Sequence, residues 1–249
     1  MEQIITNRIK WPTIQGGEGS LSELEKLTLG NFILLSDAKV ILEFGSFKGV
    51  TTKFIVEFCQ INQIHAKIFA FDIPEVANKL SKIPELENAI AIGMLTFVPG
   101  YLPHSLIEWK NEHRGLKVDM VLDDALHSYK SVWEELNLVW PILNEGGYVL
   151  CHDYSHKYEG VRLAVNRFAK RNGAHIQPLV SKNTFSNDSN SKIIHKSVLV
   201  SLSKKSTYLE SNFSEALFVR KFYLKQFFAR TNFWKFVRPF VKKETQIDQ

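Results

Sequence analysis

The sequence has few of the features that mark secreted or membrane proteins. Only two of its 249 residues are cysteine, and Cys59 and Cys151 lie in apolar stretches that suit buried, reduced thiols better than a disulfide framework. The nearly apolar run 89–98 is about half of the roughly 20 residues needed to cross a bilayer. Residues 1–11 lack the apolar core of a signal peptide. We therefore expect a cytoplasmic protein.

Acidic residues are missing from one part of the chain, which accounts for its net charge. The net charge is +5, but residues 218–243 hold eight Lys or Arg and no Asp or Glu, so the remainder carries 5 − 8 = −3. A mildly acidic main domain argues against a nucleic-acid groove. The content of 45% hydrophobic and 23% charged residues is that of a globular protein.

Strand and helix signals alternate after about residue 30. Such alternation predicts an α/β, Rossmann-like fold with a mostly parallel seven-stranded sheet and helices on both faces. We expect a helical lead-in over residues 1–30, the main domain over 31–205 and an extension over 206–249. The expected strands are 39–44, 67–72, a strand within 89–97, 118–123, 147–152, 176–180 and 197–202. The expected helices are 20–35, 50–59, 75–80, 104–113, 129–143 and 160–171.

The end of the first expected strand is rich in small residues. Gly45 and Gly49 bracket a strand-to-helix turn where a ligand can approach the backbone and the free N–H groups of the following helix. The spacing is G-x-x-x-G rather than the G-x-G-x-x-G of a dinucleotide site, and Glu43 would repel a pyrophosphate. A cationic or zwitterionic ligand fits better, although two glycines also suit a tight turn without a ligand.

An acidic residue ends the second expected strand. Asp72 follows the glycine turn by a little over 20 positions, where a carboxylate can accept hydrogen bonds from both hydroxyls of a ribose. This spacing favours a nucleoside site. The alternative is an ordinary strand-ending aspartate before the turn at Pro74.

Together these motifs resemble those of class I S-adenosylmethionine (SAM)-dependent methyltransferases. The segment 118–129, VDMVLDDALHSY, and the later segment 141–154, with Gly146-Gly147 and His152-Asp153-Tyr154, are similar to the branch of macrocin-type sugar O-methyltransferases and cephalosporin hydroxylase-like proteins. The resemblance covers roughly residues 20–205 and implies SAM as the cofactor. The cofactor contacts that it implies are Glu43, Gly45, Ser46, Gly49, Asp72, Tyr101 and Asp123.

The resemblance also implies catalytic and metal-binding residues. Methyl transfer to a hydroxyl needs an in-line nucleophile and a group that removes its proton. A neutral His127 at pH 7 is the expected base, with Asp124 beside it. In metal-dependent relatives, carboxylates after the fourth and fifth strands bind a divalent cation, and Asp124 and Asp153 match those positions, for Mg²⁺ or another divalent ion. His152 departs from the acidic pair of such relatives and is open as a ligand, a second base or a structural histidine.

The C-terminal extension combines aromatic and basic residues. Phe233, Phe236 and Phe240 can share one helical face opposite Lys235 and Arg238, although Pro239 would kink that helix. We expect a basic aromatic helical extension. It would either contact a membrane interface peripherally or pack on the main domain or a partner subunit, including a second copy of the chain.

Three classes of function follow from these patterns. The first is a SAM-dependent methyltransferase, with O-methylation of a sugar or another small biosynthetic intermediate as its reaction. The second is a nicotinamide-dependent oxidoreductase, which the glycine spacing and the lack of a suitable Tyr-x-x-x-Lys pair disfavour. The third is a non-catalytic binding or scaffold protein on the same fold.

Overall fold

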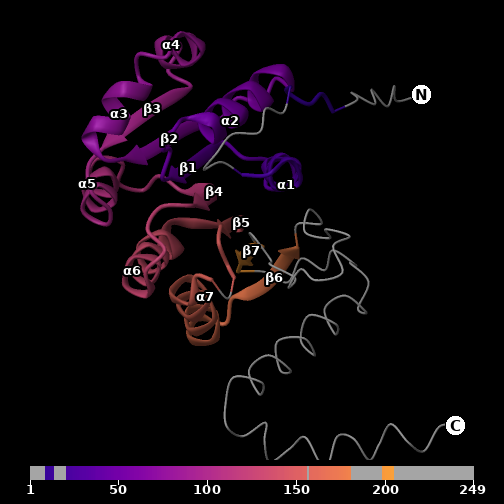
Figure 1. Ribbon diagram of the computed structural model, residues 1–249, viewed down its shortest axis with the longest axis vertical. Coiled ribbons are helices and arrows are strands. Elements are labelled where there is room, and N and C mark those ends of the chain that lie inside the picture. Colours follow the sequence, from indigo (N-terminus) through magenta and orange to yellow (C-terminus); the bar gives the residue numbers. More distant parts are fainter. Residues whose placement is uncertain (1–8, 14–20, 156, 181–197, 205–249) are drawn as a thin grey trace, which may run out of the picture. The chain divides into compact units, whose positions relative to one another are not determined.

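The computed structural model describes residues 9–13, 21–155, 157–180 and 198–204 of the chain. The predicted extension 206–249 lies outside the described residues. The described elements form one seven-stranded sheet in the order β3-β2-β1-β4-β5-β7-β6 (Figure 1). No helix among the described residues is long and apolar enough to cross a membrane.

The strands confirm the predicted mostly parallel sheet. From β3 through β5 all neighbouring strands pair in parallel, whereas β7 pairs antiparallel with both β5 and β6. The carboxyl ends of β1 to β5 therefore meet at one edge of the sheet. The strands are β1 Val40–Phe44, β2 Lys67–Asp72, β3 Leu95–Pro99, β4 Val118–Asp123, β5 Leu143–Cys151, β6 His175–Val180 and β7 Val198–Ser203.

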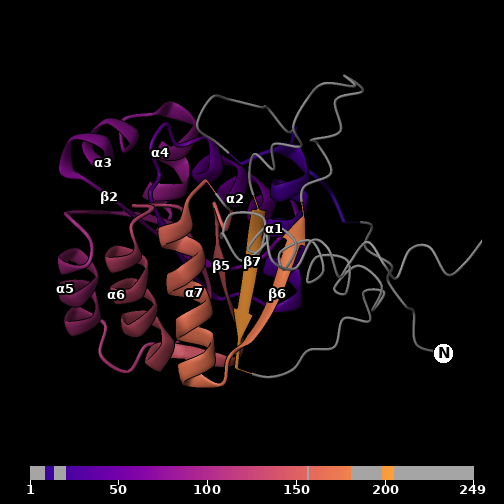
Figure 2. The ribbon, with the colours of Figure 1, turned by 60° about the horizontal axis from the view of Figure 1, so that its bottom comes forward.

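Helices cover both faces of the sheet, as predicted. The helices α5, α6 and α7 stand side by side on one face (Figure 2), while α1, α2 and α4 pack on the other. The helices are α1 Glu23–Leu35, α2 Val50–Ile61, α3 Pro74–Leu80, α4 Pro84–Ala91, α5 His104–Glu112, α6 Tyr129–Val139 and α7 Glu159–Asn172, with a 3₁₀ turn at Trp140–Ile142.

The alternation of side chains along each strand divides the core in two. In β1, Leu42 and Phe44 point into the cluster that contains α5, α6 and α7, whereas Ile41 points into the cluster that contains α1 and α2. All five residues of β1 are buried, as expected for a central strand covered on both faces. The sheet thus fixes the backbone from which the edge loops extend.

Helix α1 begins with a capping box that also buries a charge. The Ser22 hydroxyl accepts from the Glu25 N–H, and the Glu25 carboxylate accepts from the Ser22 N–H at 2.8 Å and from its hydroxyl at 2.7 Å. Glu25 is nevertheless only 3% exposed. A carboxylate at the first turn is favoured by the helix dipole.

The third strand was predicted within residues 89–97, and β3 begins there at Leu95, after α4 ends at Ala91. The fifth strand was predicted to begin at residue 147 after a Gly146-Gly147 turn, and that expectation was wrong. Gly146-Gly147 does not form a turn that introduces β5. Both glycines lie inside β5, where the pairing with β4 shifts register between Val118 and Met120.

Candidate active site

The turn between β1 and α2 has the backbone geometry of a ligand cradle. Gly45 has φ 84° and Gly49 has φ 75°, conformations that favour glycine. The Gly45 N–H donates to the carbonyl of Phe71 at 2.9 Å, which ties the turn to β2. Gly49 is the N-cap of α2 and has no side-chain cap. The first N–H groups of α2 are therefore available to a ligand.

This turn contacts the loop that follows β4. The Asp124 N–H donates to the carbonyl of Phe44 at 3.0 Å. A Cβ atom added to Gly45 would overlap the carbonyl oxygen of Asp124. Gly45 is therefore required at this position for close packing as well as for its φ angle.

Asp72 holds the glycine turn in place. One carboxylate oxygen accepts from the backbone N–H groups of Ser46 at 2.7 Å and Phe47 at 2.8 Å, and the other accepts from Ile73 at 2.7 Å. A carboxylate has about four acceptor positions, so one position remains for a ligand hydroxyl. The Asp72 carbonyl also accepts from Gly100, which brings the turn after β3 alongside.

Glu43 is fully buried beneath the same turn. One of its oxygens accepts from the Thr52 hydroxyl at 2.7 Å, and the other has no hydrogen-bond partner among the described residues. Burial raises the pKa of Glu43 to about 8, because a carboxylate loses hydration when it is removed from water. A cationic ligand nearby would favour its ionised form.

Apolar side chains are exposed after each of the first four strands. Phe47 is 56% exposed, Ile73 38%, Tyr101 65% and Leu126 62%. They follow β1, β2, β3 and β4 in turn, so all four lie at the edge where the carboxyl ends meet. Exposed apolar side chains gathered at one edge indicate a ligand-binding surface. Tyr101 was predicted as a cofactor contact, and that role stays a prediction. The sequence patterns did not indicate that Phe47 and Ile73 are exposed at this edge.

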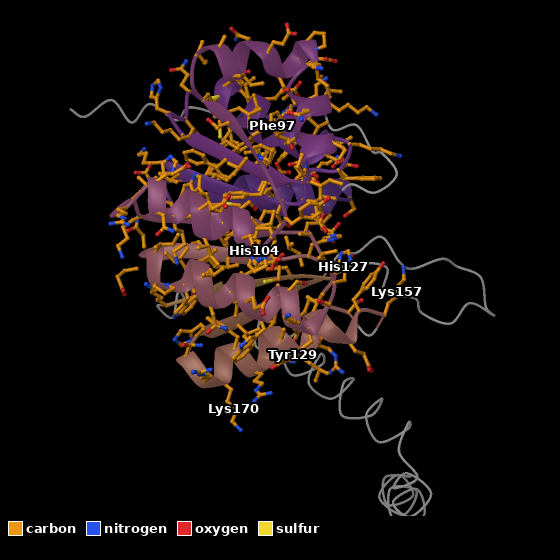
Figure 3. The ribbon with its side chains drawn as sticks, turned by 90° about the vertical axis from the view of Figure 1, so that its left-hand side faces the viewer. Phe97, His104, His127, Tyr129, Lys157 and Lys170 are labelled. Carbon is orange, nitrogen blue, oxygen red and sulfur yellow. The ribbon has the colours of Figure 1, made fainter. Side chains whose placement is uncertain are left out.

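Four ionisable side chains come together beside this edge. Asp124 and His127 follow β4, His152 and Asp153 follow β5, and their ligand-type atoms lie within 4.8 Å of one another. His127 Nε2 is 2.8 Å from Asp153 Oδ2, and His152 Nδ1 is 2.8 Å from Asp124 Oδ1. The His127 ring stacks on Tyr158 at 4.5 Å and lies at the edge near Lys157 (Figure 3).

The carboxylates strongly favour the protonated histidines. Asp124 and Asp153 raise the pKa of His127 to about 10. For His152, burial opposes the charge, but Asp124, Asp153 and Glu25 outweigh it and raise the pKa to about 12. The expectation of a neutral His127 at pH 7 was therefore wrong for the ligand-free protein, because two carboxylates stabilise its charge.

Helix α1 supplies a carboxylate that the sequence analysis did not identify. Glu25 Oε1 lies 3.5 Å from His152 Nε2, on the side of the ring opposite Asp124. Burial opposes its ionisation, but His152 and Ser22 lower the pKa of Glu25 to about 2. An acid in the first turn of a helix is usually a surface residue, so the position of Glu25 in the sequence did not indicate that its side chain contacts His152.

A second buried pair of acids lies below the cluster. Asp123 and Glu135 are 5% and 0% exposed, and burial together with their mutual repulsion raises the pKa of Glu135 far above its ordinary range. One proton is therefore retained between the two carboxyls. Asp123 was predicted to contact the cofactor, but its side chain faces Glu135 and its cofactor role stays a prediction.

The cluster fits a divalent cation. Asp124 and Asp153 were predicted as metal ligands, and the structure brings them together with two imidazoles. Mg²⁺ prefers oxygen ligands, whereas imidazole suits transition ions such as Zn²⁺, Fe²⁺ and Ni²⁺. The donor set is therefore mixed, with oxygen and nitrogen atoms at one centre.

A hollow of about 700 Å³ is lined by residues of α2 and by Lys48 and Gly49 of the glycine turn. It includes Trp11, Lys26 and Lys53 and does not include the four residues of the cluster. The size of the hollow alone does not make it the reaction site, because the ionisable groups with strongly shifted pKa values lie in the cluster after β4 and β5.

Comparisons with known proteins agree with this architecture. Residues 42–154 match the family model described as a methyltransferase domain. The O-methyltransferase TomG from Streptomyces achromogenes, involved in tomaymycin synthesis and solved with SAM, is 13% identical with a TM-score of 0.58, over 78% of this chain and 92% of that one. An O-methyltransferase from Bacillus cereus, solved with SAH, is 12% identical with a TM-score of 0.57, over 76% and 84%.

A sugar-modifying enzyme is also among the similar structures. CalS11, a TDP-rhamnose 3′-O-methyltransferase of calicheamicin biosynthesis, is 15% identical with a TM-score of 0.56, over 72% of this chain and 78% of that one. None of the curated protein sequences matches the chain. The fold is shared with these solved O-methyltransferases, and the match over residues 42–154 agrees with the methyltransferase resemblance predicted from the motifs.

Proposed function

We propose that the chain is a SAM-dependent methyltransferase that methylates a hydroxyl group of a small molecule. The observation that carries this proposal is the direct contact between the glycine turn and the loop bearing His127, through the hydrogen bond from Asp124 to Phe44. A methyl donor bound on the turn would lie beside a potential base. Such proximity is a major source of rate in a two-substrate reaction.

Each part of the SAM molecule has a protein group nearby that could bind it. The free oxygen of buried Glu43 and the N–H groups after Gly49 suit the ammonium and carboxylate of an amino acid. The remaining acceptor position on Asp72 suits one ribose hydroxyl, and exposed Tyr101 suits stacking on adenine. The solved O-methyltransferases with bound SAM or SAH support this assignment.

The proposed chemistry is an in-line displacement. The acceptor oxygen attacks the methyl carbon, the carbon–sulfur bond breaks, and its electron pair stays on sulfur to give S-adenosylhomocysteine. Because the carboxylates keep His127 protonated in the ligand-free protein, His127 must first release that proton. The hydroxyl proton then passes to Nε2 of His127, and Asp124 and Asp153 stabilise the imidazolium that forms. A divalent cation held by Asp124 and Asp153 would orient the acceptor oxygen and favour its ionisation.

The side chains around His127 restrict the chemical class of the acceptor molecule. Leu126 is exposed and apolar, and Tyr158 stacks on the imidazole. We infer an acceptor that places a hydroxyl beside an apolar face, as a deoxysugar or another partly reduced biosynthetic intermediate does. The sugar O-methyltransferase among the similar folds supports this class.

Calorimetric titration with S-adenosylhomocysteine and with NAD tests the proposal. We expect binding of S-adenosylhomocysteine and none of NAD. Asp72→Ala should weaken binding about tenfold or more, because hydrogen bonds to a charged acceptor contribute roughly 1.5–3 kcal/mol. The control is Asp37→Ala, at the opposite edge of the sheet, where Asp37 pairs with Lys39 in solvent.

The alternatives give different results in the same experiment. Binding of NAD alone would support the oxidoreductase. Binding of S-adenosylhomocysteine without turnover of any hydroxylated acceptor would support the scaffold protein.

A further inference from the structure

We propose that Glu135 is a positioning residue, whose hydrogen bond to Asp123 holds the loop of residues 124–127 against the glycine turn. Such a residue acts through another group, which here is the backbone of the loop after β4. The effect of Glu135 on the cofactor site rests on the proposed function, whereas its effect on the loop does not.

The carboxyls of Asp123 and Glu135 are buried and have each other as partners. Asp123 ends β4 and Glu135 lies in α6. Asp123 Oδ2 and both oxygens of Glu135 receive no hydrogen bond from an N–H or O–H group of the described residues, yet the two carboxyls are hydrogen-bonded to each other. A hydrogen bond between two carboxyl oxygens needs a proton on one of them. The pair therefore holds one proton, which joins the end of β4 to α6.

One face of α6 contacts the loop at two places. Ser131 lies four residues before Glu135 and so on the same side of the helix. The buried Ser131 hydroxyl donates to the carbonyl of Leu126 at 2.9 Å, while Glu135 contacts Asp123 just before the loop. Helix α6 therefore fixes the loop at both of its ends.

The backbone around Asp123 contacts the rest of the site. The Asp123 carbonyl accepts from the His152 N–H at 2.9 Å, and the Ala125 N–H faces the Asp123 carboxyl and stabilises its charge. A Cβ atom on Gly45 would come within 2.9 Å of the Ala125 Cα, so the loop packs directly on the glycine turn. A displacement of Asp123 would therefore reach both the turn and the loop after β5.

Packing alone does not require an acid at position 135. The other buried residues of this part of α6 include the apolar Val132, Leu136 and Val139. Burying two carboxyls costs free energy that an apolar side chain at position 135 would not. The acid is explained by the donor that it supplies to Asp123, which sets the position of the loop.

Hydrogen exchange and calorimetry of the full chain test this role. In Glu135→Leu, Asp123 loses its buried donor, so the amides of residues 124–127 should exchange faster while those of β1 and β2 keep their rates. Affinity for S-adenosylhomocysteine should fall about tenfold or more, because a buried carboxylate left without its partner moves or draws in water. Glu135→Gln keeps a neutral donor and should restore both values.

Two further variants complete the test. Glu134→Leu makes the same change one position away, at a partly exposed side chain that pairs with Lys130, and should leave both values unchanged. Glu135→Asp is shorter by one methylene group and should give losses between those of Glu135→Gln and Glu135→Leu. The comparison of Glu135→Asp with Glu135→Gln carries the test if Glu135→Leu does not fold.

The results can contradict the proposal in separate ways. Normal exchange of residues 124–127 in a folded but destabilised Glu135→Leu or Glu135→Asp protein would overturn it, since Glu135 would then only stabilise the core. Equal losses in Glu135→Gln and Glu135→Leu would also overturn it. Faster exchange with unchanged affinity would overturn the effect on the cofactor site. If the unmodified protein binds no S-adenosylhomocysteine, the proposed function fails, and the exchange rates still test Glu135.

Discussion

His127 and His152 lie in one cluster of carboxylates, but their surroundings at the residue scale divide their roles. Replacing His127 by Ala should lower turnover by about 10² to 10⁴, because general-base catalysis contributes that much. Affinity for S-adenosylhomocysteine should stay nearly unchanged, since the imidazole contacts the Asp124 loop and Tyr158 rather than the glycine turn. Single-turnover rates and calorimetry measure the two quantities separately.

Two results bear on that prediction. His65→Ala, remote from the cluster, should retain full activity. Full activity in a folded His127→Ala protein would mean that proximity and alignment, rather than proton removal, supply the rate.

Glu43 gives the cofactor site a pH dependence. Burial raises its pKa to about 8, so below that pH the ligand-free protein holds a neutral carboxyl. A cationic cofactor binds the carboxylate form more tightly, so affinity should rise with pH and level off above about 8. Titrations at about pH 6 and about pH 9 should differ in the unmodified protein and agree in Glu43→Gln. An equal pH dependence in both proteins would assign the effect to another group.

At the scale of elements, two helices contribute acids that pattern analysis could not detect. The acidic residues at the strand ends could be predicted as site residues, because Glu43, Asp72 and Asp124 interrupt or terminate apolar runs. Glu25 and Glu135 lie in helices, where an acid every few residues is normal on a solvent-facing surface. Their burial depends on which way α1 and α6 turn against the sheet, and local sequence does not determine that.

The bounds of β3 were predicted only coarsely, for a related reason. A continuous apolar run suits a buried strand or a buried helix segment, and periodicity alone does not separate them. Here the run 89–98 contains the end of α4, a turn at Gly93 and most of β3. The boundaries of β2 and β4, with charged residues at both ends or a clear turn, were predicted correctly.

The packing of α7 against the catalytic loop yields a prediction about an element. A Cβ atom on Gly160 would lie 2.8 Å from the His127 carbonyl oxygen and 2.7 Å from the Tyr129 nitrogen. Gly160→Ala should shift α7 or the loop, cost about 1–3 kcal/mol of stability, and lower turnover more than cofactor affinity. Gly146→Ala, where an added Cβ meets no atom within 4 Å, is the control. Denaturant titration and kinetics give both values, and equal behaviour of the two variants would contradict the prediction.

At the scale of the whole molecule, buried acids with lowered and with raised pKa values make the free energy of unfolding depend on pH in opposite directions. Glu25 and Asp153 have pKa values below their ordinary range, so their contribution is present near neutral pH and is lost as acid protonates them. Glu43 and Glu135 have raised pKa values, so their contribution is present at low pH and is lost as the pH rises. Stability should therefore be greatest between these two ranges.

Glu135 provides the test of the alkaline side. Its folded-state pKa lies above the ordinary 4.5, so the folded protein binds more protons than the unfolded chain at higher pH. The free energy of unfolding should then fall by up to about 1.4 kcal/mol per pH unit for this one carboxyl. Glu135→Gln keeps a neutral donor next to Asp123 and should flatten that decline, measured by urea titration between the ordinary pKa of 4.5 and the folded-state pKa of about 10. Glu134→Gln, a partly exposed neighbour in the same helix, should decline like the unmodified protein. Parallel declines in all three proteins would show that the buried acid pair does not control alkaline stability.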